Sequence, residues 1–326
     1  MRYASLALFA LVIVVIVLSS ATGDREGQAR HASVARLPRR PWTAIHNWVY
    51  WLDGPRLDQI GRSHFELAVI DYSADGTAAG AFSGAQIEAL RQATCERRVL
   101  AYLSIGEAEN YRWYWRRGWR AGVPAWIVGQ DANWPGNFWV RYWDPAWQSI
   151  IYRYLDKIIA AGFDGIYLDR IDAYAEPYAQ SHEQDMVAFV EAIARYARRR
   201  SPIGRDFGVI VQNAEDLAVG HPAYVATVDG IGREETYVRA TNRPTPAAER
   251  ADVETKLALF RRHSRSGLVL TVDYATRPDL IRLAYQEARL KGFIPYVADV
   301  ALDRVQTSSG YMPECHPLSA SPTTGG

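Results

Sequence analysis

Six carboxylic acids and one amide follow short apolar segments of the sequence, at the points where those segments end. They are Asp71, Glu107, Asp169, Asn213, Glu234, Asp273 and Asp299. An acid at such a position commonly caps the following helix, and this role competes with a chemical one at each single position. Seven positions together favour one polar site. Two carboxyl groups in such a site can cleave a glycosidic bond, because one protonates the leaving oxygen while the other attacks the anomeric carbon or activates water.

The apolar segments recur along the chain and alternate with helical patterns. Eight segments rich in Val, Ile and Tyr predict strands that are buried on both faces. They cover residues 44–51, 67–71, 98–104, 165–169, 208–212, 230–234, 268–273 and 293–297. Helices are predicted from Asp144 to about Ala161, after a capping-box signature at residues 181–184, and up to Gly292. Eight such units favour a single (β/α)8 TIM barrel, with the open doubly wound sheet as the alternative.

The connection after the third strand is much longer than the others. It spans residues 105–143, whereas such connections usually take about 2–6 residues. All eleven Trp residues lie between Trp42 and Trp147, and seven of them fall in this connection. A loop of this length needs a small core of its own and is commonly functional. We therefore expect a long Trp-rich insert that walls the cleft, with two or three of its Trp side chains facing a ligand.

Composition and charge exclude several classes of protein. The 326 residues are 48% hydrophobic and 22% charged, which excludes disorder, collagen and a coiled-coil rod. The net charge of +1 offers no basic surface for nucleic acid or anionic lipid. The seven His show no HxH or HExxH spacing, and neither CxxC nor a complete dinucleotide or phosphate-binding loop occurs, so no metal and no cofactor are expected. The two cysteines, Cys95 and Cys315, form either one long-range disulfide or two separate thiols.

The ends of the chain differ in composition from its middle. An unbroken apolar run at 4–18 predicts a signal peptide over residues 1–21, and an uncleaved N-terminal anchor is the alternative. Residues 22–41 are polar and Arg-rich, which predicts a flexible linker. The barrel domain is expected at 42–305 and a C-terminal tail at 306–326. The protein is accordingly expected to be a monomer that is secreted or extracytoplasmic, touching a membrane only through a possible anchor.

Several motifs make the sequence resemble glycoside hydrolase family 114. They are AYLSIGEAE at 101–109 followed by YR at 111–112, YWDP at 142–145, and GFDGIYLD at 162–169 followed by DAY at 172–174. The resemblance covers roughly residues 42–300. It implies a (β/α)8 barrel without a metal and an activity similar to that of endo-α-1,4-polygalactosaminidase. Members of this family were once misnamed as cysteinyl-tRNA synthetases, but a role in tRNA charging disagrees with the absence of a basic surface and a nucleotide loop.

The resemblance also implies a catalytic pair. The family is thought to use an Asp at the end of strand four, which matches Asp169, and a Glu at the end of strand six, which Glu234 matches best. Arg233 stands where the family usually has an apolar residue, and Glu235 is the alternative to Glu234. The hypothesis is that Asp169 is the nucleophile and Glu234 the general acid/base of a retaining mechanism. Contacts with substrate are expected from Asp71, Tyr102, Glu107, Tyr167, Asp172, Asn213 and Asp273. For Tyr102 and Tyr167, packing inside the barrel is the competing interpretation.

The expected function is that of an exported glycoside hydrolase whose substrate is an amino-sugar polysaccharide of the galactosamine type. A ring of carboxylates would attract such a polymer, because partial deacetylation makes it cationic. The alternative is a catalytically silent barrel that binds polysaccharide. Arg233 keeps this alternative open, because it departs from the family pattern directly before Glu234. A metal-dependent hydrolase on the same barrel would lack its His ligands.

Overall fold

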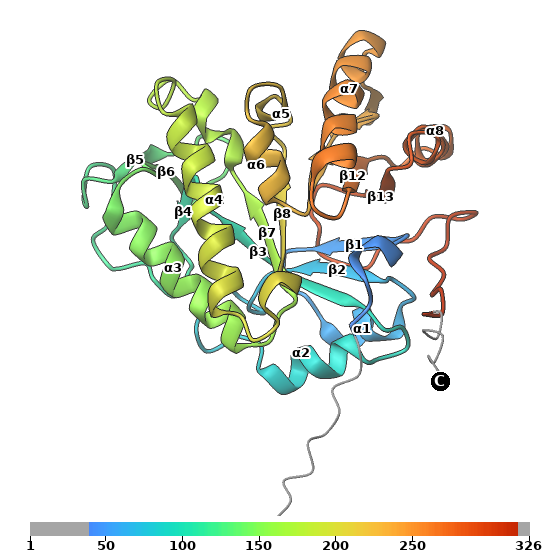
Figure 1. Cartoon of the computed structure of the whole chain (residues 1–326), viewed down its shortest axis with the longest axis horizontal. Coiled ribbons are helices and arrows are strands. Elements are labelled where there is room, and N and C mark those ends of the chain that lie inside the picture. Colours follow the sequence, from blue (N-terminus) through green and yellow to red (C-terminus); the bar gives the residue numbers. More distant parts are fainter. Residues whose placement is uncertain (1–38, 319–326) are drawn as a thin grey trace, which may run out of the picture. The chain divides into compact units, whose positions relative to one another are not determined.

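Eight parallel strands form the sheet that the sequence predicts. The structure is a computed structural model and describes residues 39–318. Within that part of the chain the strand order is β1-β2-β3-β7-β8-β9-β12-β13 (Figure 1). The strands are β1 (Trp48–Trp51), β2 (Leu67–Ile70), β3 (Arg98–Ser104), β7 (Gly165–Asp169), β8 (Gly208–Gln212), β9 (Gly230–Glu234), β12 (Leu268–Tyr274) and β13 (Ile294–Ala298). The first and last strands contact each other, and the Trp48 indole donates to the Ile294 carbonyl at 3.0 Å. The sheet therefore forms a nearly closed (β/α)8 barrel, which confirms the predicted fold.

Helices follow the strands around the outside of the barrel. They are α1 (Leu57–Arg62), α2 (Gly84–Arg91), α3 (Pro145–Ala160), α4 (Glu183–Arg200), α5 (Leu217–Gly220), α6 (Pro222–Thr227), α7 (Ala247–His263) and α8 (Pro278–Leu290), with 3-10 turns η1 (Trp42–Ala44), η2 (Ile171–Ala175) and η3 (Gly204–Asp206). The predicted start of α3 is confirmed, because the Asp144 side chain accepts from the Ala146 amide at 2.8 Å. The capping box predicted before α4 is wrong: the N-cap is His182 and no side chain caps it. His182 instead stacks on Trp143, with ring centroids 3.5 Å apart.

Aromatic side chains fill the interior of the barrel. Trp48, Tyr50 and Tyr167 are buried, and the Tyr50 ring lies 5.5 Å from Trp48 and 5.3 Å from Tyr167 between centroids. Gly232 on β9 faces this cluster, and a Cβ there would lie 1.8 Å from the Tyr167 phenol oxygen. The absence of a side chain at Gly232 therefore gives Tyr167 its place in the core.

The long insert folds into a small sheet of its own. Its strands β4 (Glu107–Glu109), β5 (Ile127–Gln130) and β6 (Asn137–Val140) pair antiparallel in the order β4-β6-β5, beside α3 and α4 in Figure 1. Most of its Trp side chains pack on one another or on the barrel. Trp126 contacts Trp147 of α3 and also Trp119, with centroids 5.0 Å apart in both pairs. Trp134 differs, because 52% of its surface is exposed.

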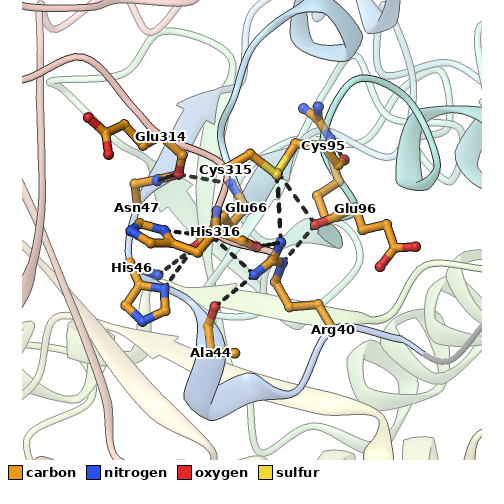
Figure 2. A network of polar contacts seen from close by, with 11 residues as sticks. Arg40, Ala44, His46, Asn47, Glu66, Cys95, Glu96, Glu314, Cys315 and His316 are labelled. Atoms are coloured by element: carbon orange, nitrogen blue, oxygen red, sulfur yellow. Dashed lines mark hydrogen bonds and ion pairs between the residues drawn. A yellow bond between two sulfur atoms is a disulfide. The ribbon is translucent and has the colours of Figure 1, made fainter. Parts of the chain in front are cut away.

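At the amino ends of the strands, a disulfide and several polar contacts join chain segments that are far apart in the sequence (Figure 2). A disulfide joins Cys95 to Cys315, which decides between the two alternatives that the sequence left open. Arg39 and Arg40, placed in the linker by the sequence analysis, belong to the barrel: Arg39 binds Asp164 at 2.6 Å, and Arg40 is buried. These ion pairs explain why Arg39 and Arg40 are part of the barrel although an Arg-rich composition predicted a flexible linker there.

The structure divides into two units, Met1–Pro38 and Arg39–Gly326. The predicted signal peptide or anchor at 1–21, and the linker up to residue 38, lie outside the described residues. Within residues 39–318, no helix has the length and apolar character needed to cross a membrane.

Candidate active site

A cavity of about 810 Å³ opens at the carboxyl ends of the barrel strands. Residues that follow β1, β2, β3, β7, β8, β9 and β13 line it, together with Tyr274 at the end of β12. Six of the predicted site residues take part in the lining: Asp71, Tyr102, Glu107, Asp169, Asn213 and Glu234. The barrel thus brings together groups that are up to 163 residues apart in sequence, at the end where the site of such a barrel is expected.

Asp169 ends β7 and is held by two donors. The Tyr102 phenol donates to its Oδ2 at 2.5 Å, and the Arg170 amide donates to its Oδ1 at 2.7 Å. Burial, followed by the negative charge of Glu234, raises the pKa of Asp169 to about 7, although the bond from Tyr102 opposes this shift. At neutral pH this carboxyl group can therefore exchange a proton, as acid–base chemistry requires.

Glu234 ends β9 and has three side-chain donors of its own. Gln212 and Asn213 donate to its Oε2 at 2.6 and 3.0 Å, and the Tyr274 phenol donates to its Oε1. The Tyr50 phenol in turn donates to Gln212 at 2.7 Å, which fixes the amide with its nitrogen toward Glu234. Such a shell of donors fixes the orientation of the carboxyl group.

Glu235 also lines the cavity, but it has a different neighbourhood. Its φ of +55° takes the backbone out of the strand conformation, so the alternation of a strand does not apply to it. Its carboxylate accepts from the Ala240 amide at 2.8 Å and so closes the loop after β9. Arg233 forms an ion pair with Glu215 at 2.9 Å and donates to the Glu234 backbone carbonyl. These contacts of Arg233 leave the Glu234 carboxylate to the Gln212 and Asn213 amides and the Tyr274 phenol.

Several residues at the carboxyl ends of the strands have a left-handed backbone conformation. The residues directly after β7, β8 and β9 are Arg170, Asn213 and Glu235, with φ of +60°, +56° and +55°. Each conformation is costly for a residue with a side chain and is common at functional sites. Asn tolerates it best, because its short polar side chain bonds locally.

Two arginines cross-link the acids of the insert. Arg112 is buried between Asp71 and Glu109, with its Nε 2.6 Å from the Glu109 carboxylate. Arg170 binds Glu107 at 2.5 Å and also Asp131, and its guanidinium lies 4.5 Å from the Trp139 ring centroid.

Glu107 has a pKa of about 7, because burial raises it more than Arg170 lowers it. Asn137 donates to its second oxygen at 3.1 Å. The insert therefore positions Glu107 at the cavity, as predicted for a wall of the cleft. Of its seven Trp, however, only Trp134 lines the cavity, because the others are used in packing.

Three residues predicted to contact substrate lie outside this lining, and the expectation of a direct contact finds no support there. Tyr167 is fully buried in the barrel core. Asp273 is fully buried as well, and its Oδ1 accepts from the Tyr237 and Val238 amides at 2.6 and 2.8 Å. Asp172 lies on η2 and is half-buried. Asp299, a further strand-end acid, accepts from the Ala301 amide at 3.2 Å and so closes a turn.

Sequence reasoning missed several residues that touch the catalytic candidates. Tyr274, Gln212 and Tyr50 form the Glu234 shell, and Arg112 and Arg170 hold the acids of the insert. Arg112 stood within a motif quoted from the sequence, and Gln212 directly precedes Asn213. Tyr274 directly follows Asp273, so one more residue along that strand would have identified it.

Charge in the cavity is strongly negative. Eight acids line it (Asp53, Asp71, Asp75, Glu107, Glu109, Asp169, Glu234 and Glu235) against three bases (Arg112, Arg170 and Arg233). The formal balance is therefore minus five, although the whole chain carries +1. A concave site of one sign raises the local concentration of ligands of the opposite sign.

A barrel of this kind, with paired carboxyl groups at the carboxyl ends of its strands, defines the class of TIM-barrel glycoside hydrolases. Within that class the chain belongs to glycoside-hydrolase family GH114, which it matches over residues 28–312. This confirms the family that the motifs indicated, and membership of this family supports the activity of a glycoside hydrolase.

Several individual proteins are also similar to this chain. An uncharacterized protein of Deinococcus radiodurans is 41% identical over 318 residues, which cover 90% of this chain and 97% of that protein. Among solved structures, Aspergillus fumigatus Ega3 in complex with galactosamine has a TM-score of 0.60 at 19% identity, covering 82% of this chain and 98% of that chain. The glycoside hydrolase domain of PelA from Pseudomonas aeruginosa has a TM-score of 0.60 at 16% identity, covering 83% and 100%. The two structures share the fold.

Proposed function

We propose that this protein hydrolyses the glycosidic bonds of a galactosamine-type polysaccharide, with Asp169 and Glu234 as the catalytic pair. The observation that carries the proposal is the position of both carboxyl groups in one cavity, where the charge of Glu234 raises the pKa of Asp169. Two carboxyls that interact in this way hold one proton between them near neutral pH. A glycosidase needs that state, one carboxylic acid beside one carboxylate.

The proposed roles follow from the donor shells. Asp169 attacks the anomeric carbon through a carboxylate oxygen, while Tyr102 at Oδ2 and the Arg170 amide at Oδ1 hold the group in place. Glu234 protonates the leaving glycosidic oxygen and then accepts a proton from the attacking water, and Gln212 and Asn213 keep it oriented. Retention of configuration is the proposed outcome, because a covalent intermediate on Asp169 is displaced from the same face.

The proposed substrate class rests on charge. A galactosamine unit without its acetyl group carries an ammonium, and the cavity offers eight acids against three bases. The fold is shared with Ega3, which was solved in complex with galactosamine. Tyr111 and Trp134, which are 46% and 52% exposed at the cavity, supply aromatic faces for sugar rings.

Export is part of the same proposal. Its support is the apolar run at 4–18 and the Cys95–Cys315 disulfide, because structural disulfides persist in oxidising compartments. A polymer too large to enter a cell also requires an enzyme outside it.

The decisive experiment compares Asp169→Asn, Glu234→Gln and the matched control Glu235→Gln on a panel of amino-sugar polymers. Product size is read by mass spectrometry and anomeric configuration by NMR. We expect the first two variants to lose about a thousandfold or more of kcat, and the control to stay within a few fold of wild type. Rates near wild type in both variants would refute the pair. Loss in Glu235→Gln with an active Glu234→Gln would transfer the acid/base role to Glu235.

Azide separates the two roles. In a variant that lacks the acid/base, azide attacks the glycosyl-enzyme and gives a glycosyl azide of retained configuration. In a variant that lacks the nucleophile, azide attacks the substrate directly and gives inversion. We therefore expect retention with Glu234→Ala and inversion with Asp169→Gly, and the opposite pattern would exchange the roles.

A catalytically silent binder is the second candidate, and the contacts of Arg233 bear on it. An arginine paired with the Glu234 carboxylate would have disabled the acid/base, but Arg233 pairs with Glu215. This contact favours the enzyme. A wild-type protein that retains the polymers without releasing products would support the binder.

A further inference from the structure

His46, Glu66 and His316 meet at the amino ends of the strands, away from the cavity. His46 precedes β1, Glu66 directly precedes β2, and His316 belongs to the C-terminal segment beside Cys315 (Figure 2). In a parallel barrel these positions lie at the face opposite to the ends that carry Asp169 and Glu234. The cluster therefore belongs to no part of the site described above.

The three side chains have the spacing of metal ligands. The Nδ1 atom of His46 lies 3.0 Å from Oε2 of Glu66, and the Nδ1 atom of His316 lies 3.0 Å from Oε1. One ligand atom from each residue lies within 4.8 Å of the others. Two ligands of a tetrahedral zinc ion, each bound at about 2.0–2.1 Å, stand about 3.3 Å apart. The two imidazole rings lie beside each other with centroids 4.4 Å apart, and rotation about their side-chain bonds can adjust the ligand spacing.

Burial separates the three residues into a fixed carboxylate and two adjustable rings. Glu66 is fully buried, and the backbone amides of His46 and His316 donate to its two oxygens at 2.7 and 2.9 Å. The side chains of His46 and His316 are 51% and 48% exposed. A metal ion can therefore enter from the solvent side, and water can complete its coordination.

Arg40 lies on the protein side of the same carboxylate. Its Nη1 is 3.0 Å from Oε1 of Glu66, and the guanidinium is held by the carbonyls of Ala44, Glu96 and His316 at 2.7–3.1 Å. The arginine offsets the charge of Glu66 when the site holds no metal. Because it is fixed by three carbonyls, it stays behind the carboxylate and leaves the two imidazoles available.

We infer that His46, Glu66 and His316 bind a divalent transition metal of the zinc type, which fastens the C-terminal segment to the barrel beside the Cys95–Cys315 disulfide. Imidazole and carboxylate ligands suit Zn²⁺ and its neighbours better than Mg²⁺. The ion takes the place of the proton between each Nδ1 and Glu66. A neutral imidazole then carries its proton on Nε2, and an imidazolium releases one proton on binding.

The test uses the full chain without a polyhistidine tag, with its disulfide intact and stripped of metal by EDTA. ZnCl₂ and MgCl₂ are titrated into it by calorimetry. We expect one Zn²⁺ per chain and no heat with Mg²⁺. Binding should weaken at least tenfold in His46→Ala and in His316→Ala and vanish in the double variant. His263→Ala, an exposed histidine at the end of α7, is the matched control and should bind as wild type does.

Two further readouts make the result independent of folding losses. Zn²⁺ should raise the melting temperature of the wild type and leave that of the folded double variant unchanged. Anomalous diffraction at the zinc edge should show a peak between the two imidazoles. The inference is overturned if the wild type gives no heat with Zn²⁺, or if the double variant binds it as the wild type does. Hydrolytic activity is not the readout, so failure here leaves the proposed function standing.

Discussion

The phenol oxygen of Tyr102 lies 2.5 Å from Oδ2 of Asp169, across the paired strands β3 and β7. A donor to a carboxylate favours the charged form, so this contact lowers the pKa of Asp169 against the burial that raises it. The Tyr102 side chain thus both holds the proposed nucleophile and lowers its pKa.

Replacing Tyr102 by Phe should move the pH dependence of the reaction. In the wild type we expect kcat/KM to fall as the pH rises through about 7, because the pair then loses its last proton. In Tyr102→Phe this limb should shift to higher pH, since the contact that lowers the pKa of Asp169 is gone, and activity should fall about tenfold or more. The measurement is the pH profile of kcat/KM, with Tyr111→Phe as a cavity-lining control. An unmoved limb would contradict the tuning role.

Asp169 should also make stability depend on pH. Burial and Glu234 raise its pKa from 3.8 to about 7 on folding, so the folded state binds more protons between these values. Stability therefore falls as the pH rises from about 4 to about 7. Relative to Asp169→Asn, the wild type should lose up to about 4 kcal/mol over that range, at about 1.4 kcal/mol per pH unit. Urea unfolding at a series of pH values measures this difference, and parallel curves for the two proteins would contradict it.

Arg112 should be essential for stability. Its removal leaves Asp71 and Glu109 buried without their cation, and breaking a buried pair of this kind costs about 3–5 kcal/mol. We expect a loss of this size in urea unfolding of Arg112→Met at pH 8. The exposed Arg117 is the control, because Arg117→Ala should change stability by less than about 0.5 kcal/mol. Equal stabilities of the two variants would show that the pair contributes little.

Gly232→Ala should strain the core and disturb catalysis at once. The new Cβ would meet the Tyr167 phenol at 1.8 Å, and Glu234 follows two residues later on the same strand. Overpacking of this kind costs about 1–3 kcal/mol. We expect a lower melting temperature together with a lower kcat, and partial recovery in the double variant with Tyr167→Ala. Gly129→Ala is the control, since nothing lies within 4 Å of a Cβ there. Equal effects of the two substitutions would be the contrary result.

The fold could be predicted from the sequence because each strand of the barrel has a recognisable local sequence pattern. Seven of the eight strands begin within one residue of their expected starts, since each is a short apolar run between turn residues. The exception is the first, where residues 42–44 form a 3-10 turn and the strand begins only at Trp48. The residues between this turn and the strand contain no residue type that indicates where the strand begins.

The candidate site was predictable only in part. The positions of Asp169 and Glu234 in the site could be predicted because both lie at the ends of predicted strands, and the ends of the strands converge in a barrel. Strand-end position did not distinguish Glu107, which lines the cavity, from Asp273, which binds two backbone amides beneath it. That difference depends on the loop after β9 folding back over Asp273, a long-range contact without a local signature.

The disulfide has a consequence for cleavage of the chain. Cys95 and Cys315 are 220 residues apart, and six of the eight barrel strands, both catalytic candidates and the whole Trp-rich insert lie between them. A protease that nicks any loop in this covalent ring opens the ring without releasing a fragment. The two pieces would migrate as one band under non-reducing conditions and separate only after reduction. The half of the site on β7 thus remains joined to the half on β9 even when the loop between them is cut.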